Sequence, residues 1–162
     1  DNEHWGQQWG VHVMSHLYAA RAVAPKMAAR GGGKLVNTAS AAGPLMQMNS
    51  AVYTATKPAA VGLAEWLAVE WAPKGVSVSV VCPLRVETPM TANMTDSASV
   101  RDGVITADEA AATILEGVAD DRFMIYTHPK AGAYWSKKAT DPERWIKGMT
   151  GLKQKLNPNG DD

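Results

Sequence analysis

Apolar residues recur at intervals of three and four along residues 5–30, which predicts an amphipathic helix there. The positions that carry this period are Val13, Met14, Leu17, Tyr18 and Ala22. Gly31-Gly32-Gly33 follows, and because glycine adopts positive φ at little cost, we expect the helix to end at these residues. A second long helix is predicted over the Ala-rich residues 50–71, and Lys74-Gly75 closes it.

Short apolar and β-branched runs between the helices predict strands. Those runs are residues 34–40, 76–82 and 122–127. The second run reads Val-Ser-Val-Ser-Val-Val-Cys, stops at Pro83 and gives the clearest strand signal.

The stretch at residues 84–105 is irregular, and helical signals return after it. Thr106, with Glu109 three residues later, matches a capping box, which predicts a helix that runs to about residue 118. Further helical segments are expected around residues 134–138 and 142–156.

Helices and strands alternate along the chain, which favours an α/β fold with a parallel sheet and right-handed crossovers. Three strands make a thin sheet, and the strand at residues 34–40 would have an exposed edge. A chain that begins on a helix has the pattern of the second half of a larger unit. We therefore expect a partial domain over residues 1–156 and a flexible tail over residues 157–162.

Composition argues against several classes of function. The 162 residues carry 16 Lys and Arg against 16 Asp and Glu, which disfavours nucleic-acid and anionic-membrane partners, because both need clustered positive charge. No run of 18 apolar residues is present and the polar start does not resemble a signal peptide, so a cytoplasmic protein is expected. One cysteine, Cys82, leaves no internal disulfide and no cysteine-based zinc site, and we expect no metal.

Candidate chemistry lies at the start of the second long helix. Tyr53 and Lys57 are four residues apart, so they share one helix face. A phenol ordinarily titrates at about pH 10 and is a poor base at neutral pH, whereas an ammonium held close to it favours the phenolate. Such a pair suits proton transfer to a substrate oxygen, which Ser40 at the mouth of the preceding strand could hydrogen-bond. The alternative is a chance spacing, with a surface lysine beside a partly buried tyrosine.

Four segments occur in the order and spacing of a known family. They are Trp5 through Val11-His12-Val13 to Pro25-Lys26-Met27, Val36-Asn37-Thr38-Ala39-Ser40-Ala41-Ala42-Gly43, Tyr53 with Lys57, and Pro83-Leu84-Arg85-Val86-Glu87-Thr88-Pro89-Met90. Together they resemble the short-chain dehydrogenase/reductase family. The resemblance implies a Rossmann-like doubly wound parallel sheet, of which this chain would hold the C-terminal portion. It also implies hydride transfer between an alcohol and a ketone that depends on NAD or NADP.

The resemblance implies roles for individual residues. Tyr53 would be the acid–base that exchanges a proton with the substrate oxygen, Ser40 would orient that oxygen, and Lys57 would hold the nicotinamide ribose. Tyr53 and Lys57 would also contact the cofactor. The residues expected along its nicotinamide end are Pro83, Val86 and Thr88. His12 stands where the family has a catalytic asparagine, so it is either part of a proton relay or a helix histidine with no catalytic part.

The sequence departs from the family in two further ways. Leu84 replaces a family glycine, so a bulky residue would adopt positive φ or crowd the cofactor. The family's Gly-x-x-x-Gly-x-Gly turn, which receives the pyrophosphate, is absent from these residues, as is the residue that distinguishes NAD from NADP. We therefore expect a fragment: a truncated, poorly active form of the enzyme. The alternative is a non-catalytic remnant that acts as an interaction module.

Methionines near the candidate site indicate a small hydrophobic alcohol or ketone as substrate, although methionines also simply fill gaps in a core. The residues predicted to bind the substrate are Ser40, Met46, Met90 and Met94. In the family the two long helices commonly build a dimer interface, and their Ala-rich faces here would allow close approach. A homodimer or homotetramer is therefore expected.

Overall fold

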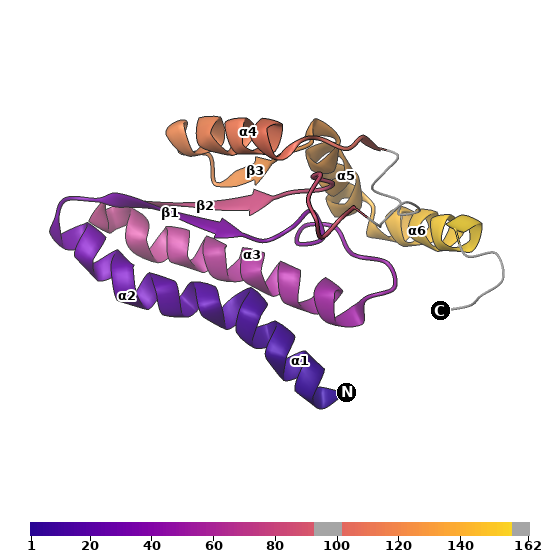
Figure 1. The fold of residues 1–162 in the computed structure, drawn as a ribbon, viewed down its shortest axis with the longest axis horizontal. Coiled ribbons are helices and arrows are strands. Elements are labelled where there is room, and N and C mark those ends of the chain that lie inside the picture. The colour runs from indigo at the N-terminus through magenta and orange to yellow at the C-terminus, as the bar shows by residue number, and fades with distance from the viewer. Residues whose placement is uncertain (93–101, 157–162) are drawn as a thin grey trace.

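The computed structural model describes residues 1–92 and 102–156, whose arrangement Figure 1 shows. The helices are α1 (Asn2–Trp9), α2 (Ser15–Ala29), α3 (Ala51–Trp71), α4 (Ala107–Ala119), α5 (Pro129–Thr140) and α6 (Pro142–Leu156). The strands are β1 (Gly33–Thr38), β2 (Val76–Cys82) and β3 (Met124–Tyr126). A π-helical segment, Gly10–Met14, joins α1 to α2, and a 3₁₀ turn, Ala72–Lys74, follows α3. The predicted tail at residues 157–162 lies outside the described residues.

The three strands form one parallel sheet in the order β1-β2-β3, which confirms the α/β fold predicted from the alternation of elements. In Figure 1, α2 and α3 lie on one side of the sheet and α4 lies on the other. β3 is shorter than the predicted run at residues 122–127, because its ladder ends where Tyr126 pairs with Cys82. The next residue on β2's side is Pro83, which has no N–H to continue the ladder.

Small residues allow α3 to lie close against the sheet. Ala60, Ala64 and Leu67 recur on one face of α3 and are buried in a cluster with Val78 and Val80 of β2. Because alanine fills little space, the helix backbone approaches the strands closely. Burial of a leucine side chain such as Leu67 contributes about 1.5–3 kcal/mol to folding. This packing fixes the start of α3 relative to the ends of the strands.

Two turns meet at the end of the molecule away from the strands' carboxyl ends. Gly31 and Gly32, with φ of 92° and 140°, end α2, and Gly75, with φ of 77°, ends the turn after α3. The amide of Gly33 donates to the Gly75 carbonyl at 3.2 Å. A Cβ on Gly32 would lie 2.5 Å from that same carbonyl oxygen, so the approach requires glycine. The predicted helix end at these glycines is confirmed.

The helix starts follow the capping signals. Thr106 Oγ1 accepts from the amide of Glu109 at 3.2 Å, and the Glu109 carboxylate accepts from the amide of Thr106 at 2.7 Å. This reciprocal pair confirms the predicted capping box at the start of α4.

Within residues 1–92 and 102–156, no helix combines the length and the apolar character that a membrane span needs.

The first helix differs from the single regular helix predicted over residues 5–30. Its backbone passes through the π-helical segment Gly10–Met14, where the amide of Ser15 donates to the Gly10 carbonyl, five residues back. A π-turn holds one more residue than an α-turn and rotates the residues after it, and such segments are frequent at functional sites. His12 lies in the middle of the segment.

Candidate active site

Ser40 lies in the loop that follows β1, and backbone hydrogen bonds hold this loop beside the end of β2. The amide of Ala39 donates to the Val81 carbonyl at 2.9 Å, and the amide of Ala41 donates to the Pro83 carbonyl at 2.7 Å. The Ser40 hydroxyl accepts from the amide of Ala42 at 3.1 Å. Ser40 is therefore fixed at the carboxyl edge of the parallel sheet, where such folds bind their ligands.

Tyr53 and Lys57 lie on the first two turns of α3. Ser50 caps the helix by accepting from the amide of Tyr53 at 3.3 Å, which sets where the helix begins. Lys57 Nζ lies 5.3 Å from the centre of the Tyr53 ring, and the predicted sharing of one helix face therefore gives a real contact. The Lys57 side chain is buried while Tyr53 is half-exposed. Burial lowers the pKa of Lys57, and nearby Cys82 partly opposes this.

Gly43 brings the Ser40 loop onto α3. A Cβ at Gly43 would lie 2.6 Å from Val61 Cγ2, 3.1 Å from the Ser40 carbonyl oxygen and 3.3 Å from the Lys57 carbonyl oxygen. The loop and the helix therefore touch through backbone at this point, which only glycine permits without a shift of one or the other. The sequence offered Gly43 only as part of a motif, and its role in joining Ser40 to Lys57 comes from the structure.

Cys82 lies beneath these groups. The backbone of Ser40 hydrogen-bonds its thiol, and the Lys57 ammonium lies close enough to interact with it electrostatically. Burial nevertheless dominates and raises the pKa of Cys82 to about 11, so that the thiol is neutral and unreactive in the folded protein. The neutral thiol therefore packs as a small apolar side chain beside the Ser40 backbone and Lys57.

His12 reaches the same cluster from the π-helical segment. Its Nδ1 lies 2.8 Å from Thr56 Oγ1, and its ring stands edge-on to the Tyr53 ring, with centroids 5.3 Å apart and planes at 85°. Burial, the Lys57 charge and then His16 lower the pKa of His12. The structure thus brings three predicted residues, His12, Tyr53 and Lys57, into one cluster, and adds Thr56, which the sequence reading missed.

His16, one turn after His12, is a second histidine that sequence reasoning did not single out. Its Nδ1 is buried without a hydrogen-bond partner. Burial and the Lys57 charge lower the pKa of His16. Both histidines are therefore held neutral at neutral pH by the same low-dielectric surroundings and the same ammonium.

Because the pKa values of His12 and His16 are lowered by folding, we expect the protein to lose stability in mild acid. Because their folded pKa values lie below the unfolded value of 6.5, the unfolded chain binds more protons as the pH falls. The two histidines therefore leave the free energy of unfolding unchanged above pH 6.5. Below pH 6.5 this free energy decreases, and the decrease continues as the pH falls through the folded pKa values. We expect urea unfolding to show this decrease, and we expect the double variant His12→Gln/His16→Gln to flatten it. His4→Gln at an exposed position is the control, and an unchanged slope in the double variant would contradict the prediction.

The turn after β2 carries the residues predicted along the cofactor, and Thr91 holds its shape. Thr91 Oγ1 donates to the Val86 carbonyl at 2.7 Å and accepts from the amide of Thr88 at 3.0 Å. The backbone of Val86 also bridges to Ile105 in parallel fashion. Pro83 opens the turn directly after β2.

Leu84 corrects one expectation about this turn. It is not among the residues with positive φ, so a bulky side chain is accommodated here without left-handed strain. Its side chain packs instead against the buried cluster of Ala41, Leu45 and Ala131. The leucine therefore contributes to the core that supports the Ser40 loop.

The donor chemistry at this edge of the sheet fits the nicotinamide end of a dinucleotide. A buried ammonium (Lys57) and two hydroxyl groups (Ser40 and Tyr53) suit ribose and substrate oxygens. Among the residues that the structure describes, no group of three or more His, Cys, Asp or Glu side chains could hold a metal ion.

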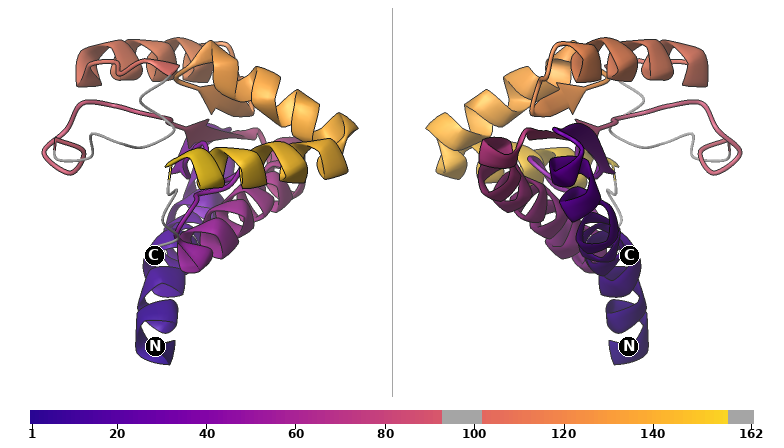
Figure 2. Two further views of the ribbon diagram at one scale, coloured as in Figure 1. Left: turned by 90° about the vertical axis from the view of Figure 1, so that its right-hand side faces the viewer. Right: turned by 90° about the vertical axis from the view of Figure 1, so that its left-hand side faces the viewer.

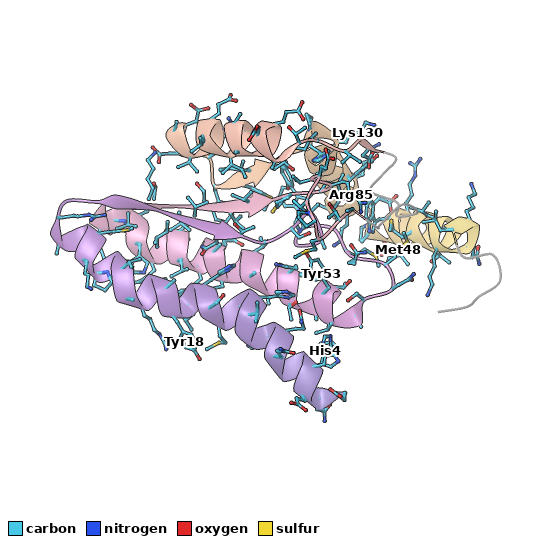
Figure 3. The ribbon with its side chains drawn as sticks, in the orientation of Figure 1. His4, Tyr18, Met48, Tyr53, Arg85 and Lys130 are labelled. Atoms are coloured by element: carbon cyan, nitrogen blue, oxygen red, sulfur yellow. The ribbon has the colours of Figure 1, made fainter. Side chains whose placement is uncertain are left out.

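The methionines predicted to bind substrate lie in different places. Met46 lines a hollow of about 660 Å³ between the loop before α3 and helix α6. In Figure 3, Met48 of the same hollow lies nearer to α6, and Tyr53 lies on α3. Met90 is 87% exposed, and Met94 lies outside the described residues. The other lining residues are Leu45, Asn49, Thr54, Pro58, Lys138, Trp145, Ile146, Met149, Thr150, Lys153 and Gln154.

Comparison with known proteins finds clear likenesses. A family model described as short chain dehydrogenase matches residues 1–99. 1-Deoxy-11-beta-hydroxypentalenate dehydrogenase of Streptomyces exfoliatus is 33% identical over 131 residues, which cover 80% of this chain and 48% of that protein. Cyclohexanol dehydrogenase of Acinetobacter sp. (strain SE19) is 30% identical over 141 residues, which cover 83% of this chain and 56% of that protein.

A solved structure is also similar. The crystal structure of a short-chain dehydrogenase/reductase from Burkholderia phymatum in complex with NAD matches with a TM-score of 0.71 at 30% identity, covering 86% of this chain and 58% of that one. The chain spans about half the length of the curated relatives it matches.

Proposed function

Because the chain belongs to the short-chain dehydrogenase family of oxidoreductases, we propose that it catalyses hydride transfer between an alcohol and a ketone through Ser40, Tyr53 and Lys57. The observation that carries this proposal is the buried Lys57 ammonium, 5.3 Å from the centre of the Tyr53 ring at the carboxyl edge of a parallel sheet. A buried charge beside a phenol in a ligand-binding position is costly, and it is typical of a functional site.

Each of these residues has a defined task in the proposed reaction. Tyr53 gives its phenolic proton to the carbonyl oxygen in reduction, or takes the proton of the alcohol in oxidation. Ser40 donates a hydrogen bond to the same oxygen, and this bond strengthens as negative charge develops there. The Lys57 ammonium, 5.3 Å from the centre of the Tyr53 ring, donates hydrogen bonds to hydroxyl groups of the ribose.

NAD or NADP supplies or accepts the hydride when it is bound. Tyr53 and Lys57 would contact its ribose, and Pro83, Val86 and Thr88 would form the wall along the nicotinamide. The NAD complex of the Burkholderia phymatum relative supports a nicotinamide cofactor.

We propose that the substrate is a small hydrophobic cyclic alcohol or the corresponding ketone. One relative is named for a cyclic alcohol, cyclohexanol, and another for a compound that carries a hydroxyl group, a hydroxypentalenate. The hollow beside Met46 is of the size that binds small molecules, and its walls are largely apolar. Thr54 and Pro58, the residues that follow Tyr53 and Lys57 in the chain, line it, whereas Tyr53 and Lys57 themselves do not.

The test is a turnover assay on the protein at its natural length. Cyclic secondary alcohols are supplied with NAD⁺ or NADP⁺, and the corresponding ketones with NADH or NADPH, while the absorbance of the reduced nicotinamide is followed. We expect turnover with one dinucleotide in preference to the other. A folded protein that neither turns over any of these substrates nor binds either dinucleotide would overturn the proposal and favour the alternative of an interaction module.

The partner proposed for α2 and α3 is a second copy of the protein. Figure 2 shows the two helices side by side on one side of the sheet, and each carries large exposed apolar side chains. They include Tyr18, Trp66 and Val69, which are 58%, 55% and 74% exposed. We expect a homodimer or homotetramer by sedimentation, and a shift toward monomer in Trp66→Glu, because a carboxylate in a paired apolar face stays unpaired. A wild-type monomer at micromolar concentration would contradict this.

A further inference from the structure

The buried hydroxyl of Thr56 takes part in two short hydrogen bonds. Thr56 is fully buried on α3, between Tyr53 and Lys57 in the chain. Its Oγ1 donates to the Val52 carbonyl at 2.8 Å, and its other short contact is His12 Nδ1, also at 2.8 Å. A hydroxyl has one proton, and the Val52 carbonyl can only accept, so the proton in the contact with His12 must come from the histidine.

This constraint determines the tautomer of His12. A neutral imidazole has one N–H and one lone pair, and which nitrogen holds the proton depends on the hydrogen bonds that the ring makes. Because Thr56 Oγ1 accepts from Nδ1, the proton of neutral His12 lies on Nδ1 and the lone pair on Nε2. Nε2 is therefore the atom at which His12 can take up a further proton.

The groups that face His12 keep it neutral and place it beside the acid–base tyrosine. From α3 these are Tyr53, whose ring plane is nearly perpendicular to the imidazole, and Lys57. From its own helical segment the facing group is His16. Burial and the Lys57 ammonium lower the pKa of His12, so the neutral ring predominates at neutral pH. An imidazolium formed here would be short-lived, because the nearby ammonium repels it.

The π-helical segment explains how the histidine reaches this position. Gly10–Met14 packs against α3, and His12 lies at its centre. An additional residue in one turn changes the direction of the side chains relative to a regular helix. The sequence signals neither this segment nor the contact with Thr56, 44 residues further along the chain.

We propose that Thr56 is a positioning residue for proton exchange at Tyr53: it holds His12 as the Nδ1–H tautomer, so that Nε2 accepts the proton that Tyr53 must release to solvent. In alcohol oxidation, after Tyr53 has taken the proton of the alcohol, the O–H bond of Tyr53 breaks and an N–H bond forms at Nε2, directly or through water. The imidazolium then returns a proton to water. In ketone reduction the same steps run in reverse, and Nε2 passes a proton from water to Tyr53. The kinetic part of this proposal rests on the proposed function, whereas the tautomer does not.

The first experiment measures the tautomer on the whole chain without any substrate. Imidazole ¹⁵N shifts are recorded by NMR for the wild type, Thr56→Ser and Thr56→Val, with His16→Gln to assign the signals. We expect His12 to be protonated on Nδ1 in the wild type and in Thr56→Ser, which keeps the hydroxyl. Thr56→Val keeps the shape and removes the acceptor, so we expect the dominant form of His12 to become Nε2–H. Protonation on Nε2 in the wild type, or on Nδ1 in Thr56→Val, would overturn the proposal.

The second experiment separates a positioning role from a merely structural one. With an active substrate pair, Thr56→Val is expected to lower kcat about tenfold with little change in KM, and Thr56→Ser is expected to restore kcat. This effect is smaller than the roughly 10²–10⁴-fold effect of a direct acid–base group. Unchanged kcat in a folded Thr56→Val would overturn the relay. If no substrate turns over, the proposed function fails while the NMR result still decides the tautomer.

Discussion

Replacing Tyr53 by phenylalanine is expected to reduce kcat/KM by about 10²–10⁴-fold, because the variant lacks the proton that the reaction exchanges with the substrate oxygen. Only one oxygen atom is removed. The aromatic ring remains, and so do its contacts with the Lys57 ammonium and the His12 imidazole. Steady-state rates for the wild type and Tyr53→Phe, with the same alcohol and dinucleotide, measure the effect.

The matched control is Tyr18→Phe. Tyr18 lies on α2, in the exposed apolar face proposed to pair with a second copy. Phenylalanine keeps its ring and therefore the apolar surface, so the loss of the hydroxyl affects neither that face nor the site. We expect this variant to keep the wild-type rate. If Tyr53→Phe retains more than about a tenth of the wild-type kcat/KM, a phenolic proton is not essential, and the assignment of Tyr53 as acid–base is wrong.

The second large effect concerns stability. Gly32→Ala is expected to lower the free energy of unfolding by about 3 kcal/mol, from a left-handed backbone strain of roughly 1–2 kcal/mol and an overpacking cost of roughly 1–3 kcal/mol. Both causes are present at this residue. Its φ is 140°, and an added Cβ would lie 2.5 Å from the Gly75 carbonyl oxygen, which belongs to the backbone and cannot easily move aside.

Gly31→Ala separates these two causes. Gly31 also has a positive φ, 92°, but a Cβ there would meet no atom within 4 Å. We expect it to lose only about 1 kcal/mol, from strain alone. Urea unfolding of both variants gives the difference between them. Equal losses would show that the two turns separate at little cost, contrary to the packing described above.

Periodicity and local chemistry predicted most of the fold. The Ala-rich period of α3, the β-branched run of β2 and the capping box at Thr106 are each determined by a few neighbouring residues, so they are visible in sequence. The π-helical segment is not, because one additional residue in a turn hardly changes the average spacing of apolar positions. The N-terminal helix was therefore predicted to be regular.

The candidate site divides in the same way. The spacing of Tyr53 and Lys57 within one helix predicted their contact, since helix geometry alone brings them together. The contacts of Thr56 with His12, and of Gly43 with α3, depend on how two distant segments pack, which no local pattern encodes. The methionines show a third case. Flexible apolar side chains predict a surface that adapts to small apolar molecules, but they do not predict where each side chain lies. The structure places Met46 in a hollow and leaves Met90 exposed.

The position of Cys82 gives the protein a reporter of its own motions. It is the one cysteine in the sequence, it is fully buried, and the backbone of Ser40 and the charge of Lys57 both act on its thiol. A thiol reagent can reach it only when the segments packed around the end of β2, which include the residues before Ser40, α3 and β3, move apart. Its rate of labelling under native conditions therefore measures how often the carboxyl edge of the sheet opens, independently of turnover. Ligands that close this edge will slow the labelling by the factor by which they suppress opening.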